Sequence, residues 1–141
     1  IAIAAHEVGH AIQDQQGDKR LATRTKMAPV VDKVARWSAA IISLSPVIGI
    51  ITRHPMPFSV LLFLGLSGFV ARMMFHAVTL PIEFDASFSK ALPLLREGNY
   101  VSQSNEKAVS SILRAAALTY VSAALADILN LGRWIVLLSR R

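Results

Sequence analysis

The chain has 141 residues, of which 53% are hydrophobic and 17% charged, and this composition excludes a disordered chain and argues against a purely soluble domain. It has no cysteine, which excludes disulfides and thiolate metal sites, so any metal must be held by His, Asp or Glu. The net charge is +6, and in so apolar a chain we attribute this excess to orientation at a membrane surface and not to nucleic-acid binding.

A first helix is predicted over residues 1–16, because an Ala- and Ile-rich stretch becomes polar and stops at Gly17, a typical helix C-terminus. Residues 17–36 follow with six basic side chains and two acidic ones. We expect them to form a basic, water-exposed connection that leads into a helix. The basic residues of this stretch are Lys19, Arg20, Arg24, Lys26, Lys33 and Arg36.

Two uncharged blocks come next, residues 37–52 and 56–71. Each falls just short of the ~17–25 residues of a membrane-spanning helix, and extension of the pair to residues 34–75 gives spanning length. Only three residues, including His54, separate the blocks, so we predict a transmembrane helical hairpin. A pair of buried core helices is the alternative, which the shortage of polar sequence elsewhere disfavours.

Two further helices are predicted after the hairpin. The first covers residues 80–92, with Pro81 in its first turn and another proline to end or kink it. The second starts from a cap at Ser102 or Ser104 and runs to Gly132. No strand pattern is found. We therefore predict an all-α, membrane-embedded helical bundle that forms one domain over the whole chain.

The strongest chemical signal is an H-E-x-x-H sequence that begins at His6. On a helix, His6 and His10 lie about 40° apart around the axis, so both imidazoles project from one face and can bind one Zn²⁺. Glu7 lies at the flank, where its carboxylate can act as general base towards a metal-activated water. The alternative is a surface helix that carries these residues by coincidence.

A peptidase zinc needs a third protein ligand. Gln16 stands where the longer form of the motif has a third histidine, so the ligand must come from another segment. Glu83 is the leading candidate, because a carboxylate among apolar and small neighbours is costly without a partner. It could instead accept an imidazole N–H, or face a helix N-terminus. Asp127 interrupts an apolar helix and is a second candidate for the third ligand. Its alternative roles are to pair with Arg133 or to face water.

Three other side chains carry weaker signals. His76 could stabilise an oxyanion, although an interfacial histidine without a chemical role is the simpler interpretation. His54 belongs to the loop on the opposite side and is not expected in the site. Tyr120 is expected to pack within its helix, with its hydroxyl satisfied locally.

The topology allows the predicted ligands to meet. Two membrane crossings return the chain to its starting side, so the histidine pair before the hairpin and Glu83 after it share that side. The basic stretch 17–36 and Arg72 lie there too, and the positive-inside rule then places the site at the cytoplasmic face. Arg53 lies in the loop on the opposite side, and its positive charge does not fit this orientation.

In three stretches, AAHEVGHAIQ, LPIEFDAS and AAALTYVSAALADILNL, the chain resembles the neutral zinc metallopeptidase family (YugP-like, gluzincin-type). The resemblance implies a multi-pass zinc endopeptidase of the bacterial plasma membrane. It implies His6 and His10 as zinc ligands and Glu7 as catalytic base. The family's E-F-D-A-S glutamate falls on Glu83, which supports that residue as third ligand.

The resemblance covers about the C-terminal two thirds of the family's usual length, so that the family's N-terminal anchor and the segment ahead of its zinc helix are outside this chain. That segment is expected to hold the substrate strand. In related gluzincins an aspartate four residues after the acid ligand orients a zinc histidine. Ser87 stands at this position, which leaves open whether it or Asp85 supports the imidazole.

These observations predict a membrane-anchored, zinc-dependent endopeptidase that cuts peptide bonds at the cytoplasmic membrane surface. Its expected partners are a peptide or protein substrate and the lipid bilayer, without nucleic acid. Two alternatives remain. One is an intramembrane protease of the site-2 type with Asp127 as third ligand, and the other is a non-enzymatic membrane scaffold that binds metal loosely or not at all.

Overall fold

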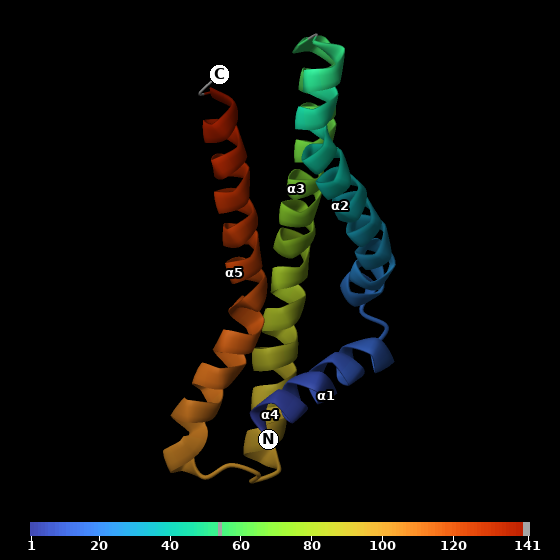
Figure 1. Cartoon of the computed structure of the whole chain (residues 1–141). Coiled ribbons are helices and arrows are strands. Elements are labelled where there is room, and N and C mark those ends of the chain that lie inside the picture. Colours follow the sequence, from blue (N-terminus) through green and yellow to red (C-terminus); the bar gives the residue numbers. More distant parts are fainter. Residues whose placement is uncertain (54, 140–141) are drawn as a thin grey trace. The chain divides into compact units, whose positions relative to one another are not determined.

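The computed structural model describes residues 1–53 and 55–139, and Figure 1 shows that helices make up nearly all of this part. The elements are α1 (Ala2–Gln15), α2 (Lys19–Thr52), α3 (Pro55–Phe84), the π-helical segment η1 (Asp85–Ala91), α4 (Leu92–Glu97), the 3₁₀ turn η2 (Gln103–Asn105) and α5 (Glu106–Ser139). The all-α prediction is therefore confirmed for the described residues. His54 lies outside them.

The end of α1 agrees with the prediction. Gly17 adopts a φ of +66°, and the N–H of Asp18 bonds to the carbonyl of Gln13 at 3.0 Å. Asp18 then caps α2, because its Oδ1 accepts the backbone N–H of Arg20 at 2.7 Å. The water-exposed connection expected over residues 17–36 is therefore wrong in extent, since the chain is helical from Lys19 onward.

The predicted helix start at residue 80 is wrong, because α3 runs through Pro81 without a break and continues into η1. Proline removes one backbone hydrogen bond, which a long apolar helix can tolerate. In η1 the turn widens, and the N–H of Leu92 bonds to the carbonyl of Ser87, five residues back. Glu83 thus lies near the end of a long helix. A position at a helix N-terminus cannot explain its burial.

The last predicted helix starts close to the expected position, although the side chain of Ser102 makes no capping hydrogen bond, and the helix ends later than predicted. Ser102 precedes η2, and α5 continues past Gly132 to Ser139. Gly132 sits inside the helix and does not have the left-handed φ of a C-terminal glycine. A glycine in a helix interior costs only about 1 kcal/mol relative to alanine, so it does not need to end one.

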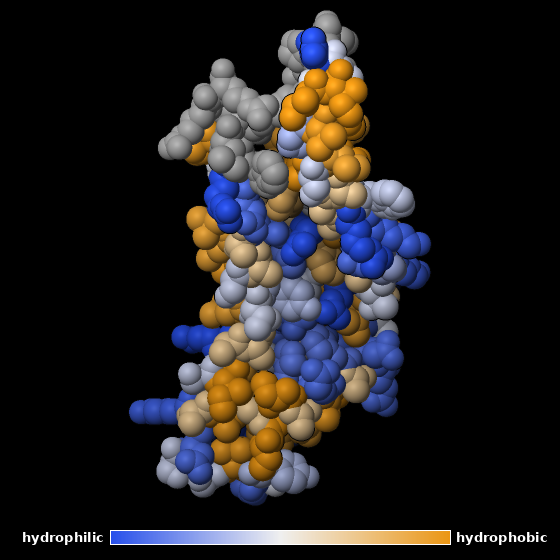
Figure 2. Space-filling model, in the orientation of Figure 1, coloured by the Kyte–Doolittle hydropathy of each residue, from blue (hydrophilic) through white to orange (hydrophobic). Residues whose placement is uncertain are grey.

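Three helical stretches among the described residues are long and apolar enough to cross a membrane: Lys19–Thr52, Val60–Glu97 and Gln103–Arg133. The first two overlap the predicted hairpin 34–75 over residues 34–52 and 60–75, and the third adds a candidate span. Side chains such as Phe63 and Leu129 are 75% and 70% exposed. On the visible face in Figure 2, apolar side chains gather over the last turns of α2 and hydrophilic ones over its middle. Such apolar faces fit a lipid environment.

The chain divides into two compact units. Unit 1 comprises Ile1–Thr25 and His76–Ala123, and unit 2 comprises Lys26–Phe75 and Ala124–Arg141. In unit 2, α2 and α3 pack closely at two glycines. A Cβ atom at Gly65 would lie 2.5 Å from Ile42, and one at Gly68 would lie 2.3 Å from Ser38. Small residues at such a crossing are typical of helix pairs in membranes.

In unit 1, α1 packs across η1 and α4. A buried apolar cluster holds them together, made of Ala2, Ala5, Ala91, Leu92, Leu95 and Leu113. The closest approach is at Gly9, where an added Cβ atom would lie 2.3 Å from the backbone oxygen of Ala86. Backbone therefore lies directly on backbone here, and this contact sets how near the histidines of α1 come to η1 and the end of α3.

Gly9→Ala should destabilise the protein by about 1–3 kcal/mol, because the new methyl group meets backbone that cannot turn aside. Gly132→Ala is the matched control: nothing lies within 4 Å of an added Cβ at this helical glycine. It should be neutral or stabilise by up to about 1 kcal/mol. Thermal unfolding in detergent measures both variants, and equal midpoints for the two would contradict the assigned role of Gly9.

Candidate metal centre

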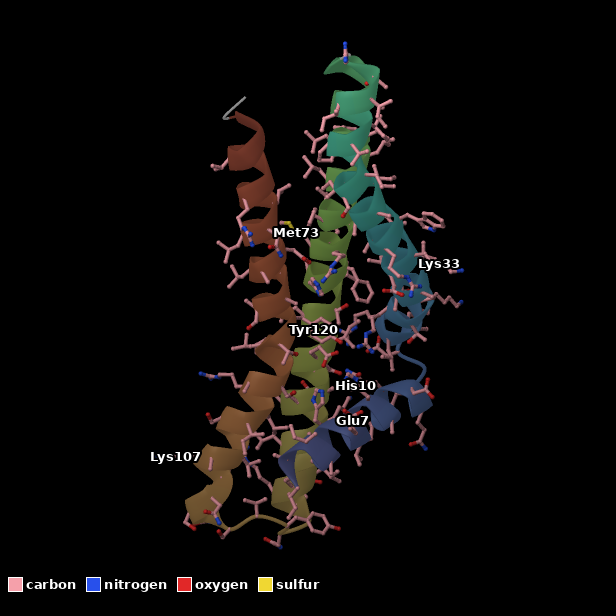
Figure 3. The ribbon with its side chains drawn as sticks, viewed as in Figure 1. Glu7, His10, Lys33, Met73, Lys107 and Tyr120 are labelled. Atoms are coloured by element: carbon pink, nitrogen blue, oxygen red, sulfur yellow. The ribbon has the colours of Figure 1, made fainter. Side chains whose placement is uncertain are left out.

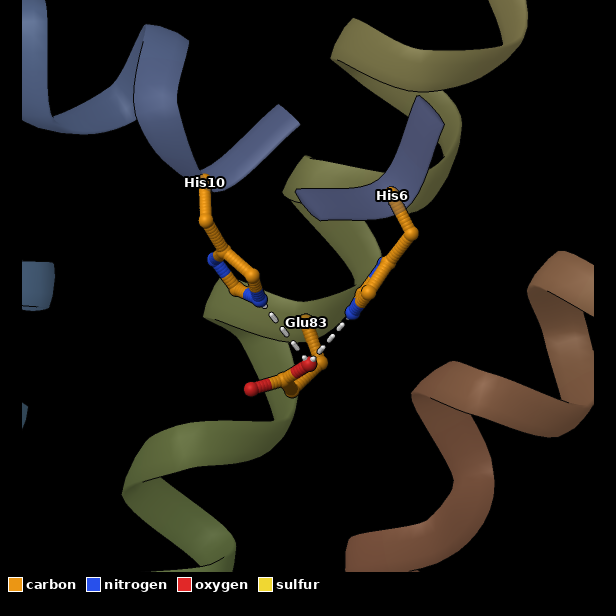
Figure 4. A group of neighbouring side chains, drawn as sticks. All are labelled: His6, His10 and Glu83. Carbon is orange, nitrogen blue, oxygen red and sulfur yellow. Dashed lines mark hydrogen bonds and ion pairs between the residues drawn. The ribbon is translucent and has the colours of Figure 1, made fainter. Parts of the chain in front are cut away.

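Three side chains of unit 1 converge on one point: His6 and His10 from α1, and Glu83 from the end of α3 (Figure 4). Both Nε2 atoms face the same carboxylate oxygen, Glu83 Oε2, at 3.2 Å from His6 and 3.3 Å from His10. One ligand atom from each residue lies within 4.8 Å of the others. The three predicted ligands are therefore neighbours, although 73 positions separate His10 from Glu83.

The residues present fit a zinc ion. Ligand atoms of a tetrahedral zinc with bonds of about 2.0–2.1 Å lie about 3.3 Å apart, and the two nitrogen–oxygen distances here are 3.2 and 3.3 Å. Glu83 is only 2% exposed and His6 only 7%. A carboxylate so deeply buried needs positive charge beside it. Two imidazole nitrogens and one carboxylate oxygen form a catalytic type of donor set, which leaves a fourth position for water or substrate.

Gln13 fixes the orientation of His10. Its side chain is fully buried, and its amide nitrogen donates to the Ile82 carbonyl at 3.0 Å and to Asp85 Oδ2 at 2.8 Å. Two acceptors on the nitrogen leave the amide oxygen for His10 Nδ1, 2.9 Å away. Nδ1 must therefore carry the hydrogen, and the lone pair of Nε2 faces Glu83.

Ser87 supports the second imidazole. Its buried Oγ lies 2.9 Å from His6 Nδ1, and a hydrogen donated by Nδ1 to this oxygen leaves Nε2 available for a metal. This geometry answers the question left open by the sequence. Ser87 contacts His6 directly, whereas Asp85 acts on His10 through Gln13.

The electrostatics of the site favour a positive charge next to Glu83. When His10 is protonated, its Nε2–H donates to Glu83 Oε2, and this hydrogen bond raises the pKa of the His10 imidazole above its ordinary value, against the opposing effect of burial. A proton on His10 and a metal cation satisfy the same buried carboxylate. They therefore compete, as is usual for histidine ligands.

Arg24 also reaches the site, although no pattern in the sequence predicts it. Its Nη2 lies 3.4 Å from Glu83 Oε1 and donates to the hydroxyl of Tyr120 at 2.5 Å. The expectation that Tyr120 is satisfied locally is thus wrong. Gln13 could have been found from its i+3 spacing to His10 on one helix face. No local pattern could have identified Arg24, because its partners are distant in sequence.

Glu7 lies on α1 one residue after His6 and is exposed (Figure 3). Within the described part of the chain it makes no hydrogen bond and no ion pair. Its carboxylate is therefore accessible to water and is not committed to another side chain. Of the other weaker candidates, His76 lies in unit 1 with its ring 5.8 Å from that of Tyr120.

Asp127 belongs to unit 2 and is not part of the His6–His10–Glu83 group. It is only 3% exposed, and its Oδ2 lies 3.1 Å from Nε of Arg72. Asp127 therefore does not face water, and it pairs with Arg72, a partner that the sequence did not suggest. A buried acid on an apolar helix is paired with an arginine on a neighbouring helix, as expected for such positions.

H-E-x-x-H histidines on a helix and a glutamate from a distant segment are the ligand types that hold zinc in many metallopeptidases. The chain belongs to the family described as "Putative neutral zinc metallopeptidase", which matches residues 1–139. The resemblance stated from the sequence is thus confirmed, and the family implies Zn²⁺ as cofactor.

One relative is the "Putative membrane protease YugP" of Bacillus subtilis (strain 168), 34% identical over 137 residues. The alignment covers 97% of this chain and 57% of that protein, so the chain spans little more than half of the relative's length. No solved structure matches the chain significantly.

Ser87→Ala should weaken zinc binding about 10- to 100-fold, since residues that orient a histidine ligand have effects of this size. Ser89→Ala, an exposed serine on the same π-helical segment, is the control and should bind zinc like the unchanged protein. Competition with a chromogenic chelator measures both affinities. Equal affinities for the two variants would show that the contact to His6 does not matter.

Proposed function

We propose that this chain carries the zinc-binding core of a membrane-anchored endopeptidase. In this proposal His6, His10 and Glu83 hold the zinc and Glu7 is the general base. The observation that carries it is the pair of Nε2 atoms, each 3.2–3.3 Å from one buried oxygen of Glu83. Family membership and the membrane protease among the relatives support the class of activity.

The reaction is the addition of water to a peptide carbonyl, followed by cleavage of the C–N bond. When bound, zinc supplies the acidity that makes water nucleophilic near neutral pH and polarises the carbonyl. Glu7 accepts the proton of the attacking water on a carboxylate oxygen and returns it to the leaving nitrogen. Gln13 and Ser87 keep both Nδ1 atoms as donors, so that the imidazoles stay correctly oriented throughout.

The proposal places the reaction at the cytoplasmic face of a bacterial plasma membrane. Ten of the 15 basic residues fall in the basic stretch 17–36 or between residues 85 and 114, whereas the hairpin loop carries only Arg53. Basic residues near membrane crossings favour the cytoplasmic side. The substrate is then a peptide or protein segment that reaches this surface.

The alternatives have less support. In a site-2 type of protease, Asp127 would have to replace Glu83, but its carboxylate pairs with Arg72. A non-enzymatic scaffold would not need Nδ1 of both histidines held by buried partners. No observation specifically favours either one.

Two glutamate substitutions test the proposal, with fluorescein-labelled casein as substrate and elemental analysis of bound zinc. Glu7→Gln should retain zinc and lower kcat at least about 100-fold, since it removes the proton acceptor. Glu83→Gln should lose most of its zinc and with it the activity. Glu97→Gln, an exposed acid at the end of α4, is the control and should behave normally.

Undiminished proteolysis by Glu7→Gln would remove it from the mechanism. Full zinc content in Glu83→Gln, together with loss of zinc in Asp127→Asn, would favour the site-2 type of enzyme. A chain that binds no zinc at all would favour the scaffold.

The absence of cysteine allows a direct test of orientation, because an introduced cysteine is then the sole thiol of this chain that a maleimide can label. Lys107→Cys should be labelled by a membrane-impermeant maleimide only after the cells are permeabilised. Arg53→Cys should be labelled on intact spheroplasts. The opposite pattern would place the site on the outer face.

A further inference from the structure

The two oxygens of the Glu83 carboxylate have different surroundings. Oε2 faces both histidines, at 3.2 and 3.3 Å. Oε1 is buried, accepts no hydrogen bond within the described chain, and lies 3.4 Å from Nη2 of Arg24. One oxygen is thus directed to the metal position, and the other lies against a permanent positive charge.

Arg24 is itself held firmly. The same Nη2 that faces Glu83 donates to the hydroxyl of Tyr120 at 2.5 Å, and the guanidinium carbon lies 5.8 Å from the centre of the Tyr120 ring. The Arg24 side chain is 26% exposed, so the surrounding protein excludes much of the water that would otherwise solvate its charge. A planar guanidinium that Tyr120 already holds through its hydroxyl and its ring loses little entropy when it also contacts Glu83.

We propose that Arg24 is a positioning residue: its guanidinium keeps Oε1 away from the metal and restricts Glu83 to binding the metal through Oε2. This inference rests on the proposed zinc site. A carboxylate can bind a divalent cation through one oxygen or through both. If Glu83 used both, it would occupy the position that a catalytic zinc keeps open for water or substrate. Arg24 prevents this, because a second cation close to Oε1 would be repelled by the guanidinium.

The alternative role is a purely structural one, in which Arg24 only offsets the charge of buried Glu83 and helps the site to fold. Removing Arg24 would then lower metal affinity and activity together. A positioning role predicts a different outcome: the metal stays bound, but its coordination number rises and catalysis slows.

Arg24→Met separates the two roles, because it keeps the length of the side chain and removes the charge. The purified protein in detergent is titrated with Co²⁺, whose visible absorption is stronger with four ligands than with five. We expect one bound ion, with affinity equal to or tighter than that of the unchanged protein, and a clearly weaker visible band. With zinc, kcat on labelled casein should fall about 10- to 100-fold while KM changes little.

Arg24→Lys and Arg36→Met are the comparison variants. Lysine restores a charge near Oε1, so its cobalt band should return towards that of the unchanged protein. Arg36 lies on the same helix in an exposed ion pair with Asp32, at 2.8 Å. Its replacement should leave the spectrum and kcat unchanged.

An unchanged cobalt spectrum in Arg24→Met would overturn the proposal, and so would a fall in kcat that only follows a loss of metal. If Arg24→Met does not fold, Tyr120→Phe replaces it, since this variant removes only the hydroxyl that anchors Arg24. It should weaken the band in the same direction, and an unchanged band would again overturn the proposal. Failure of the zinc site itself is recognised separately, because the unchanged protein would then bind no Co²⁺ in a Glu83-dependent manner.

Discussion

The candidate metal centre depends on one buried oxygen, Oε2 of Glu83, which faces two imidazole nitrogens at almost equal distances. A carboxylate that is 2% exposed is tolerated only where positive charge compensates for the lost water. The surrounding polar contacts serve this arrangement. Ser87 and Gln13 direct the nitrogens towards it, and Arg24 lies against the other oxygen.

The network behind the histidines combines one short-range contact, between His10 and Gln13, with three contacts that join α1 to the end of α3 and to η1. Gln13 lies one helical turn from His10 but bonds to Ile82 and Asp85, far along the chain. A single buried amide thus ties α1 to the end of α3 and fixes a tautomer at the same time. Because the oxygen and the nitrogen of the Gln13 amide both have defined partners, this amide favours one arrangement of α1 against the end of α3.

Much of this could be predicted from sequence, for physical reasons. The i, i+4 spacing of His6 and His10 is a local property of a helix, and an apolar hairpin that brings the chain back to its starting side follows from length and hydropathy. The nearness of Glu83 followed from this topology. The helix boundaries were less predictable: Pro81 suggested a start but lies within α3, since packing and an apolar setting override a local preference.

The contacts that were not predicted join segments distant in sequence. Arg24 was one of several basic residues in a charged stretch, and nothing nearby marks it as the one that meets Tyr120 and Glu83. Asp127 stood out as an acid within an apolar helix, but nothing near it in the sequence points to Arg72 as its partner. Which cation a buried acid meets depends on how helices are placed in space, and a single sequence does not contain that information.

The wide turn of η1 also determines the angle around the helix axis between two faces of the same continuous helix. A π-helical turn takes up an extra residue, and each residue rotates an α-helix by about 100°. Upstream of η1 the helix presents Glu83 to the histidines, and downstream it presents Leu92 and Leu95 to the apolar cluster. Loss of one residue within Asp85–Ala91 would allow only one of these faces to stay in register, so chain length in this segment is as constrained as residue identity.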